Sequence, residues 1–128
     1  MISKITFLLL ILLVGCGTQK NVTGDAETLA KINFDISQFD EKGRYGPADG
    51  KRTMDYEFCI PRTEEKMAII RKIDPAIQMP ERAKGRIGCS KAEQLCLGTT
   101  GGKENWKTVL LAIAEQDFVK RIEPNYYE

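Results

Sequence analysis

The chain has 128 residues, with 19 Lys and Arg against 18 Asp and Glu, and it contains no histidine. A nearly balanced charge gives no long-range attraction to nucleic acid, and this length supports one small domain. Without histidine the chain lacks Ser-His-Asp and Cys-His nucleophile pairs and the commonest metal ligand, so we expect no catalytic residue, no metal and no cofactor.

The first 15 residues have the pattern of a secretory signal peptide. A single cation, Lys4, precedes an apolar run over residues 5–14 that only Thr6 interrupts. This run is shorter than the about 20 apolar residues that a membrane-spanning helix needs. A charged start, a short apolar core and a small residue before the cleavage point are typical of an exported protein. We therefore predict that residues 1–15 are removed.

The end of this leader, Leu13-Val14-Gly15-Cys16, resembles the lipobox of bacterial lipoproteins. The resemblance implies a diacylglyceryl group on the Cys16 thiol and cleavage directly before it. The partner is then a lipid bilayer, because each buried methylene of an acyl chain contributes about 0.8 kcal/mol to membrane affinity. Since no Asp follows Cys16, the family's sorting pattern implies the outer membrane, facing the periplasm, in a cell with two membranes.

Residues 16–53 are predicted to be the lipidated cysteine and a polar tether. The stretch from Thr18 to about Thr53 is polar and contains scattered glycines. One part differs, because Ile32, Phe34 and Ile36 alternate with polar residues at the period of a strand. This part is predicted either to pack on the domain as a strand or to be disordered like other polar segments.

Residues 54–128 are predicted to form a domain with four strands. The strands are expected over residues 55–60, over 77–89 with an interruption, over 94–99 and over 118–124. In the first strand the apolar residues alternate with polar residues or cysteine: Tyr56, Phe58 and Ile60. In the third, Leu95 and Leu97 alternate in the same way, so each strand should bury one face. Pro80 restricts the second strand to an edge or a bulge.

Two helices are expected between these strands. Thr63 is a suitable N-cap for the first, which acidic residues follow and which Asp74-Pro75 stops. The second should begin near Lys103, because apolar residues then recur at the spacing of one helix face: Trp106, Val109, Leu110 and Ile113. Together the elements read strand, helix, strand, strand, helix, strand.

This order predicts an α+β domain, a ferredoxin-like βαββαβ sandwich whose four-stranded antiparallel sheet has both helices on one face. In such a sheet the strands lie in the order 4-1-3-2. The leucines of the third strand would then face the helices together with the aromatic residues of the first. Cys59 and Cys96 would point to the opposite face, with Cys89 one strand further out.

In an exported protein, paired cysteines are first interpreted as disulfides. Cys89 and Cys96 lie symmetrically about a polar turn, where opposed residues reach the Cβ separation of about 3.5–4.5 Å that a disulfide needs. A Cys89–Cys96 bridge is therefore the first expectation, and a bridge that includes Cys59 or a fully reduced state are the alternatives. Three cysteines without histidine or a CxxC motif indicate neither a zinc site nor a redox centre.

The C-terminal segment, EQDFVKRIEPNYYE, resembles the end of subtilisin-type propeptides and related inhibitors. The resemblance implies that residues 118–124 form an edge strand and that a tail enters a protease in substrate-like fashion: Asn125, Tyr126, Tyr127 and Glu128. An extended tail of this kind can pair as an added strand. The general expectation is different: a membrane-anchored cell-envelope lipoprotein whose domain is not an enzyme and binds an envelope protein or has a structural role. The protease inhibitor is the alternative.

Overall fold

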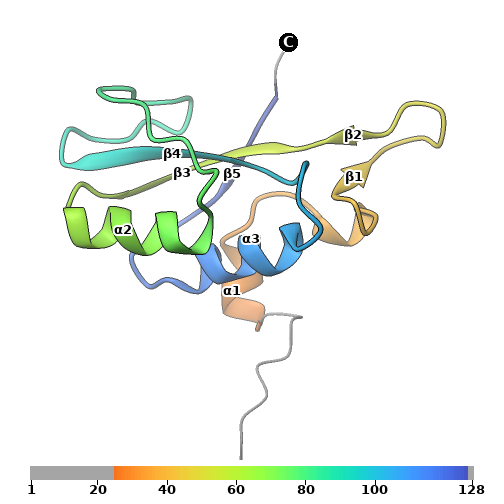
Figure 1. Cartoon of the computed structure of the whole chain (residues 1–128), viewed down its shortest axis with the longest axis horizontal. Coiled ribbons are helices and arrows are strands. Elements are labelled where there is room, and N and C mark those ends of the chain that lie inside the picture. The colour runs from red at the N-terminus through yellow and green to blue at the C-terminus, as the bar shows by residue number, and fades with distance from the viewer. Residues whose placement is uncertain (1–24, 127–128) are drawn as a thin grey trace, which may run out of the picture.

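The computed structural model describes residues 25–126 (Figure 1). Two helices, α2 and α3, pack on one face of a sheet, and the long loop between α2 and β4 lies on the other side. The elements in chain order are α1 (Ala26–Ala30), a 3-10 helix η1 (Ile36–Gln38), β1 (Arg44–Tyr45), β2 (Arg52–Thr53), β3 (Asp55–Pro61), α2 (Glu64–Ile73), β4 (Glu93–Thr99), α3 (Trp106–Glu115) and β5 (Glu123–Asn125).

The expected α+β class is confirmed, with one two-stranded and one three-stranded sheet, both antiparallel. The larger sheet has the order β4-β3-β5. The expected fourth strand, over residues 77–89, is not formed, and its only pairing among the described residues is a bridge between Gln78 and Leu97. Pro80 cannot donate to a ladder, and Gly85 and Gly88 have φ values of 66° and 80°, which turn the chain out of the extended conformation.

The first predicted helix is confirmed with its boundaries. The Thr63 side chain accepts a hydrogen bond from the Lys66 backbone N–H at 3.2 Å, and the helix ends at Asp74. Because this start and stop are encoded in neighbouring residues, the sequence is sufficient to place them. α3 begins three residues after Lys103, at Trp106, because residues 104–105 form a turn in which the Asn105 side chain makes no capping hydrogen bond.

The last strand is shorter than expected and lies later in the chain. The prediction was residues 118–124, whereas β5 covers only Glu123–Asn125. Val119 is fully buried and Phe118 packs against the core, so the apolar residues of this segment fill space beneath the sheet before pairing begins. The Lys66 ammonium lies 4.8 Å from the centroid of the Phe118 ring, a cation–π contact that joins this segment to α2.

Part of the segment expected as a tether packs on the core. Ile32 is 7% exposed and bridges Ile122 in parallel, and three neighbouring apolar side chains contact the core cluster: Phe34, Ile36 and Phe39. Of the two alternatives for this segment, packing on the domain is the one observed. It does not continue as a strand because the Asp35 carboxylate accepts a hydrogen bond from the Ser37 backbone N–H at 3.0 Å and starts η1.

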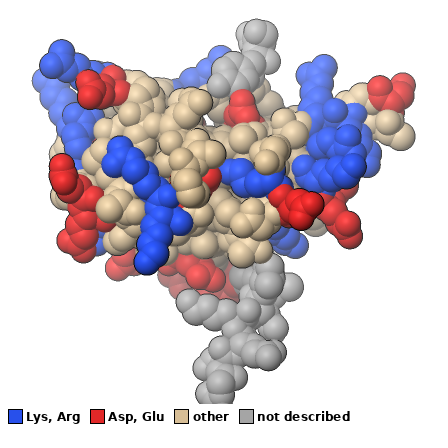
Figure 2. Space-filling model, viewed as in Figure 1, with Lys and Arg blue, Asp and Glu red and all other residues tan. Residues whose placement is uncertain are grey.

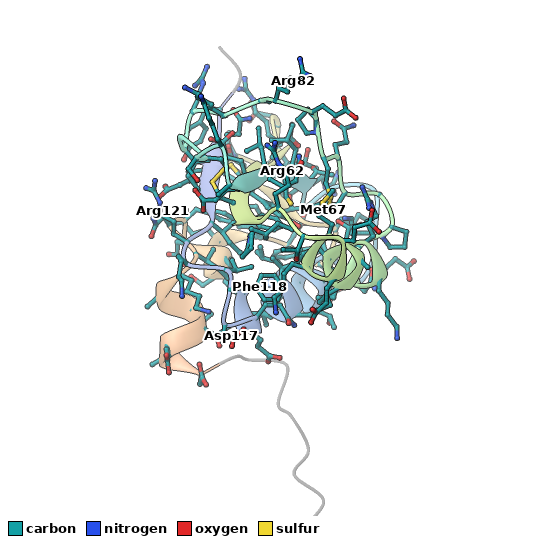
Figure 3. The ribbon with its side chains drawn as sticks, turned by 90° about the vertical axis from the view of Figure 1, so that its left-hand side faces the viewer. Arg62, Met67, Arg82, Asp117, Phe118 and Arg121 are labelled. Carbon is teal, nitrogen blue, oxygen red and sulfur yellow. A yellow bond between two sulfur atoms is a disulfide. The ribbon has the colours of Figure 1, made fainter. Side chains whose placement is uncertain are left out.

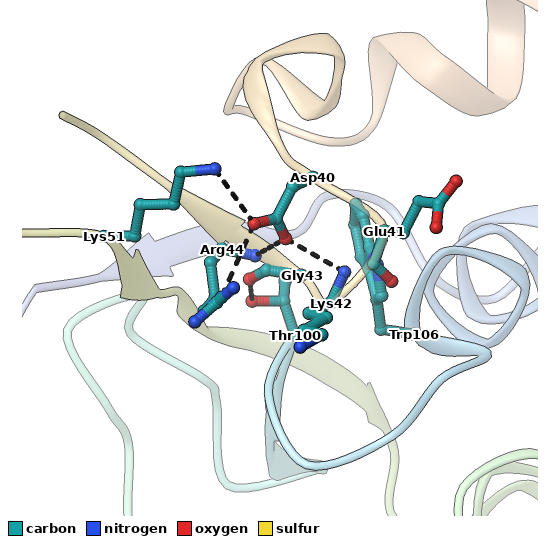
Figure 4. Close-up of polar contacts among 8 residues, drawn as sticks. All are labelled: Asp40, Glu41, Lys42, Gly43, Arg44, Lys51, Thr100 and Trp106. Atoms are coloured by element: carbon teal, nitrogen blue, oxygen red, sulfur yellow. Dashed lines mark hydrogen bonds and ion pairs between the residues drawn. The ribbon is translucent and has the colours of Figure 1, made fainter. Parts of the chain in front are cut away.

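Asp40 holds the turn that leads into β1 (Figure 4). Its carboxylate accepts hydrogen bonds from the backbone N–H groups of Lys42 and Arg44, both at 2.9 Å, and from Lys51 Nζ at 3.2 Å. The hydrogen bond from the Arg44 backbone is the main cause that holds the pKa of Asp40 below its usual value. These contacts fix the conformation of residues 40–44, which pack against the rest of the domain.

Two hydrogen bonds then attach this turn to the loop and helix that follow β4. The Thr100 hydroxyl donates to the Gly43 carbonyl at 2.6 Å, and the Trp106 indole N–H donates to the Glu41 carbonyl at 3.1 Å (Figure 4). Gly43 has a φ of 73°, and a Cβ placed there would lie 2.0 Å from the Thr100 carbonyl oxygen. Only glycine fits both the conformation and the space.

Candidate functional site

The register of β3 against β4 decides which side chains face the helices. Phe58 is opposite Cys96 and Tyr56 is opposite Gly98. Directly opposed residues share a face, so Cys96 lies in the helix-side core, where it is fully buried. The prediction that Leu95 and Leu97 face the helices is wrong. Both leucines lie on the other face, which the loop between α2 and β4 covers, so that face also needs apolar residues.

The disulfide joins Cys59 to Cys89, with a Cα–Cα distance of 5.6 Å. The first expectation, a Cys89–Cys96 bridge, is wrong, and the alternative that includes Cys59 is the one observed. The reason is the same register: Cys96 points to the helix side of the sheet, whereas Cys59 and Cys89 meet on the other side. Residues 86–89 do not pair with β4 as a hairpin arm, so Cys89 and Cys96 are not opposed.

Cys96 is the one free cysteine among residues 25–126. Burial raises the pKa of its thiol to about 12. A thiol of this kind holds its proton at neutral pH and is neither nucleophilic nor a ready metal ligand. Cys96 is therefore a core residue. Cys16, the predicted lipidation site, lies outside the described residues.

Residues 79–92, here called the covering loop, are fixed to the rest of the domain by several contacts. The Gln94 side-chain amide of β4 donates to the Pro80 carbonyl at 2.9 Å, and three further contacts hold residues 87–89. The first is the disulfide between Cys59 and Cys89. The second is Glu57, a buried residue of β3 whose carboxylate accepts a hydrogen bond from the Ile87 backbone N–H at 2.5 Å. The third is Arg121, which donates to the Ile87 carbonyl at 2.9 Å. The face expected to carry three thiols is thus covered, and the covering loop has a defined position.

A basic pocket of about 360 Å³ lies between the covering loop and the end of β3. Its lining includes four cationic residues together with Ser90 and Cys89: Arg62, Arg82, Lys84 and Lys91. No carboxylate lines it. The sequence does not indicate this pocket because these cations are scattered over 30 positions among charged residues. The Cys59–Cys89 disulfide and the hydrogen bond from the Arg62 backbone N–H to the Ala92 carbonyl bring Arg62 next to the covering loop.

A smaller polar pocket of about 160 Å³ lies at the other end of β3. It is lined by Tyr56, Asp74, Gln78 and Lys103 among others, and the Lys103 ammonium is 2.8 Å from the Asp74 carboxylate. The Tyr56 hydroxyl is buried and has no hydrogen-bond partner among the described residues, and this burial raises the pKa of the phenol. The ion pair joins the end of α2 to the chain before α3, which gives Asp74 and Lys103 a structural role.

The residues expected to form an inhibitor tail do not all lie in a tail. Asn125 belongs to β5, pairs with Asp55 and donates from its side-chain amide to Glu57 at 3.4 Å. It is therefore part of the sheet. Tyr126 is 54% exposed and follows the end of β5, while Tyr127 and Glu128 lie outside the described residues.

Within residues 25–126 there is no group of three or more Cys, Asp or Glu side chains placed to hold a metal ion. The same residues contain no helix of the length and apolar character needed to cross a membrane. No protein-family model, curated protein or solved structure matches this chain.

Proposed function

We propose that the protein is a membrane-anchored cell-envelope lipoprotein with a small non-enzymatic binding domain. The observation that carries the proposal is the lipobox-like sequence ending at Cys16, on a chain whose domain contains a disulfide. Disulfides persist in oxidising compartments, which agrees with export. A lipid-anchored domain at the outer membrane would face the periplasm, where an envelope protein or another envelope component is its partner.

The covering loop and the basic pocket lie at the end of the domain away from its first described residues. Figure 3 shows Arg82 and Arg62 in the upper half of the molecule and α1 at the bottom, and Figure 1 places the covering loop and α1 in the same way. Asp25 lies nine positions after Cys16, and a chain of this length spans at most about 30 Å when extended. An anchor at Cys16 would keep the domain near the bilayer and leave the basic pocket free for a partner beyond it.

We infer that the fold is a ferredoxin-like arrangement in which the second strand is reduced to a bridge. The order β5-β3-β4 agrees with the 4-1-3 part of that arrangement, and Gln78 pairs at the place of the missing strand. α2 and α3 on one face support the same inference (Figure 1). The covering loop packs on the sheet face that is exposed in the simple ferredoxin-like arrangement.

Replacing Cys16 by alanine tests the anchor. We expect that the wild-type protein incorporates labelled fatty acid and sediments with membranes, because the acyl chains supply the membrane affinity. The Cys16→Ala variant should lose the label and appear in the soluble fraction or as uncleaved precursor. Cys96→Ala is the matched control and should keep the label. Equal labelling of wild type and Cys16→Ala would contradict the proposal.

A protease inhibitor is a second proposal, supported by the exposed position of Tyr126 directly after the edge strand β5. An exposed tail after an edge strand can enter a protease cleft by strand addition. If this is the function, deleting residues 126–128 should abolish inhibition of a subtilisin-like protease, whereas Leu29→Ser, at an exposed site in α1, should not. Absence of inhibition by the wild-type protein would reject it.

A further inference from the structure

The basic pocket holds more positive charge than the protein itself balances. Of its four cationic side chains, those of Arg82, Lys84 and Lys91 form no hydrogen bond or ion pair with any residue in the described part of the chain. The Glu93 carboxylate accepts a hydrogen bond from the Ser90 backbone N–H at 2.9 Å and is not part of the lining. Figure 2 shows Lys and Arg side chains gathered at the upper left of the molecule, with an acidic side chain beside them.

Arg62 is held so that most of its guanidinium remains available. One Nη2–H donates to the Glu93 carbonyl at 2.8 Å, and the Arg62 backbone N–H donates to the Ala92 carbonyl at 2.9 Å. An arginine has five N–H donors in a fixed planar fork. The contact to Glu93 thus orients the side chain at the rim of the pocket and leaves donors for a ligand.

The covering-loop residues that line the pocket also have a fixed conformation. Cys89 is fixed by the disulfide to Cys59, and its backbone N–H donates to the Lys84 carbonyl at 2.8 Å. Arg82 has a φ of 57° and is the one residue other than glycine with a positive φ among residues 25–126. Such a conformation favours glycine, and strained residues are often found at ligand-binding loops. An arginine at this position supplies a charge that glycine would not.

We propose that the basic pocket binds a phosphate group. Two arginine guanidinium groups and two lysine ammonium groups line the pocket, and no carboxylate does. Such a set of donors suits a doubly charged oxyanion better than a ligand with a single carboxylate, and the Ser90 hydroxyl adds one further donor. Phosphate binding goes beyond the proposed function of an anchored binding domain. Only the assigned source of the phosphate rests on that proposed function. If Cys16 is the anchor, the pocket faces away from the bilayer, so we assign the phosphate to a soluble or polymer-borne ligand and not to a lipid headgroup.

The test measures binding of inorganic pyrophosphate to the full chain, purified in neutral detergent, by isothermal titration calorimetry. We expect saturable binding to wild type and roughly tenfold weaker binding to Arg82→Gly, since one charge-assisted contact is lost. The thermal midpoint of Arg82→Gly should be equal to or higher than that of wild type, because glycine relieves the positive φ. Lys72→Gln, an exposed cation in α2 outside the pocket, is the charge-matched control and should bind like wild type.

Three outcomes would overturn the proposal. If pyrophosphate does not bind saturably to the wild-type protein, the basic pocket is not a phosphate site. If Arg82→Gly and Lys72→Gln weaken binding equally, the binding reflects general charge and not the pocket. Citrate that binds as tightly as pyrophosphate rejects the phosphate class. A separate arm adds phosphatidylglycerol to the micelles. A stabilisation that depends on Arg82 and occurs only with this lipid identifies a headgroup and rejects the assigned source. Fatty-acid labelling of Cys16 is independent of all these results.

Discussion

Replacing Gly43 by alanine should lower the free energy of unfolding by about 3 kcal/mol, a large share of the stability of a small domain. Two causes act together. The backbone has a φ of 73°, and the new methyl group would lie 2.0 Å from the Thr100 carbonyl oxygen, which belongs to the backbone and cannot move aside freely. Urea unfolding followed through the fluorescence of Trp106, the one tryptophan in the chain, measures the effect.

Two other glycines serve as matched controls for this substitution. Gly46 also has a positive φ, 103°, but the nearest atom to an added Cβ is 3.6 Å away, so Gly46→Ala should cost about 1 kcal/mol. At Gly50 neither condition applies, and Gly50→Ala should be nearly neutral. If Gly43→Ala and Gly46→Ala have the same effect, the contact between Gly43 and Thr100 does not hold the N-terminal segment on the body.

Reduction of the Cys59–Cys89 disulfide should lower the free energy of unfolding by about 3–4 kcal/mol. The bridge closes a loop of 30 residues that includes α2, and the entropy of the unfolded chain rises when this loop is opened. The covering loop also loses its covalent attachment to β3. Urea unfolding with and without reductant measures the difference.

Two variants show whether this loss belongs to the assigned pair. The double variant Cys59→Ala/Cys89→Ala should be destabilised from the start, and reductant should have no further effect on it. Cys96→Ala removes a buried side chain and lowers stability for another reason, but reductant should still shift its midpoint as it shifts that of wild type. A wild-type midpoint that does not respond to reductant would rule out a stabilising disulfide.

α2 and α3 were predictable because their signals are local, whereas α1 and η1 lie in the segment expected as a tether. Thr63, two glutamates and Asp74-Pro75 define α2 within the segment itself. The alternation of β3 likewise identified Tyr56, Phe58 and Ile60 as one buried face. In β4 the alternation separated two sets of residues but did not say which set faces the helices, since Leu95 and Cys96 are both apolar enough for burial.

The remaining differences come from contacts between distant segments. Ile32 is buried because it meets Ile122, and neither residue indicates the other in the sequence. The covering loop has the composition of a surface loop, yet Glu57 and Arg121 both hold Ile87. The basic pocket forms where Arg62, at the end of β3, meets the covering loop, and these segments are joined by the disulfide and by the hydrogen bond from Arg62 to Ala92. Short-range patterns therefore predicted α2, α3, β3 and β4, while the loss of the strand over 77–89, the short strands β1 and β2, and the register and pairing required the three-dimensional structure.

The proposed lipid-anchored protein holds its covering loop through the Cys59–Cys89 disulfide. Mass spectrometry of unreduced tryptic peptides from the protein isolated from membranes tests it most directly, because cleavage places the three domain cysteines in separate peptides, 53–62, 87–91 and 92–103. We predict a link between peptides 53–62 and 87–91, an unlinked 92–103 peptide, and an N-terminal peptide that begins at lipid-modified Cys16. A link between 87–91 and 92–103, or an unmodified Cys16 still attached to residues 1–15, would contradict the account.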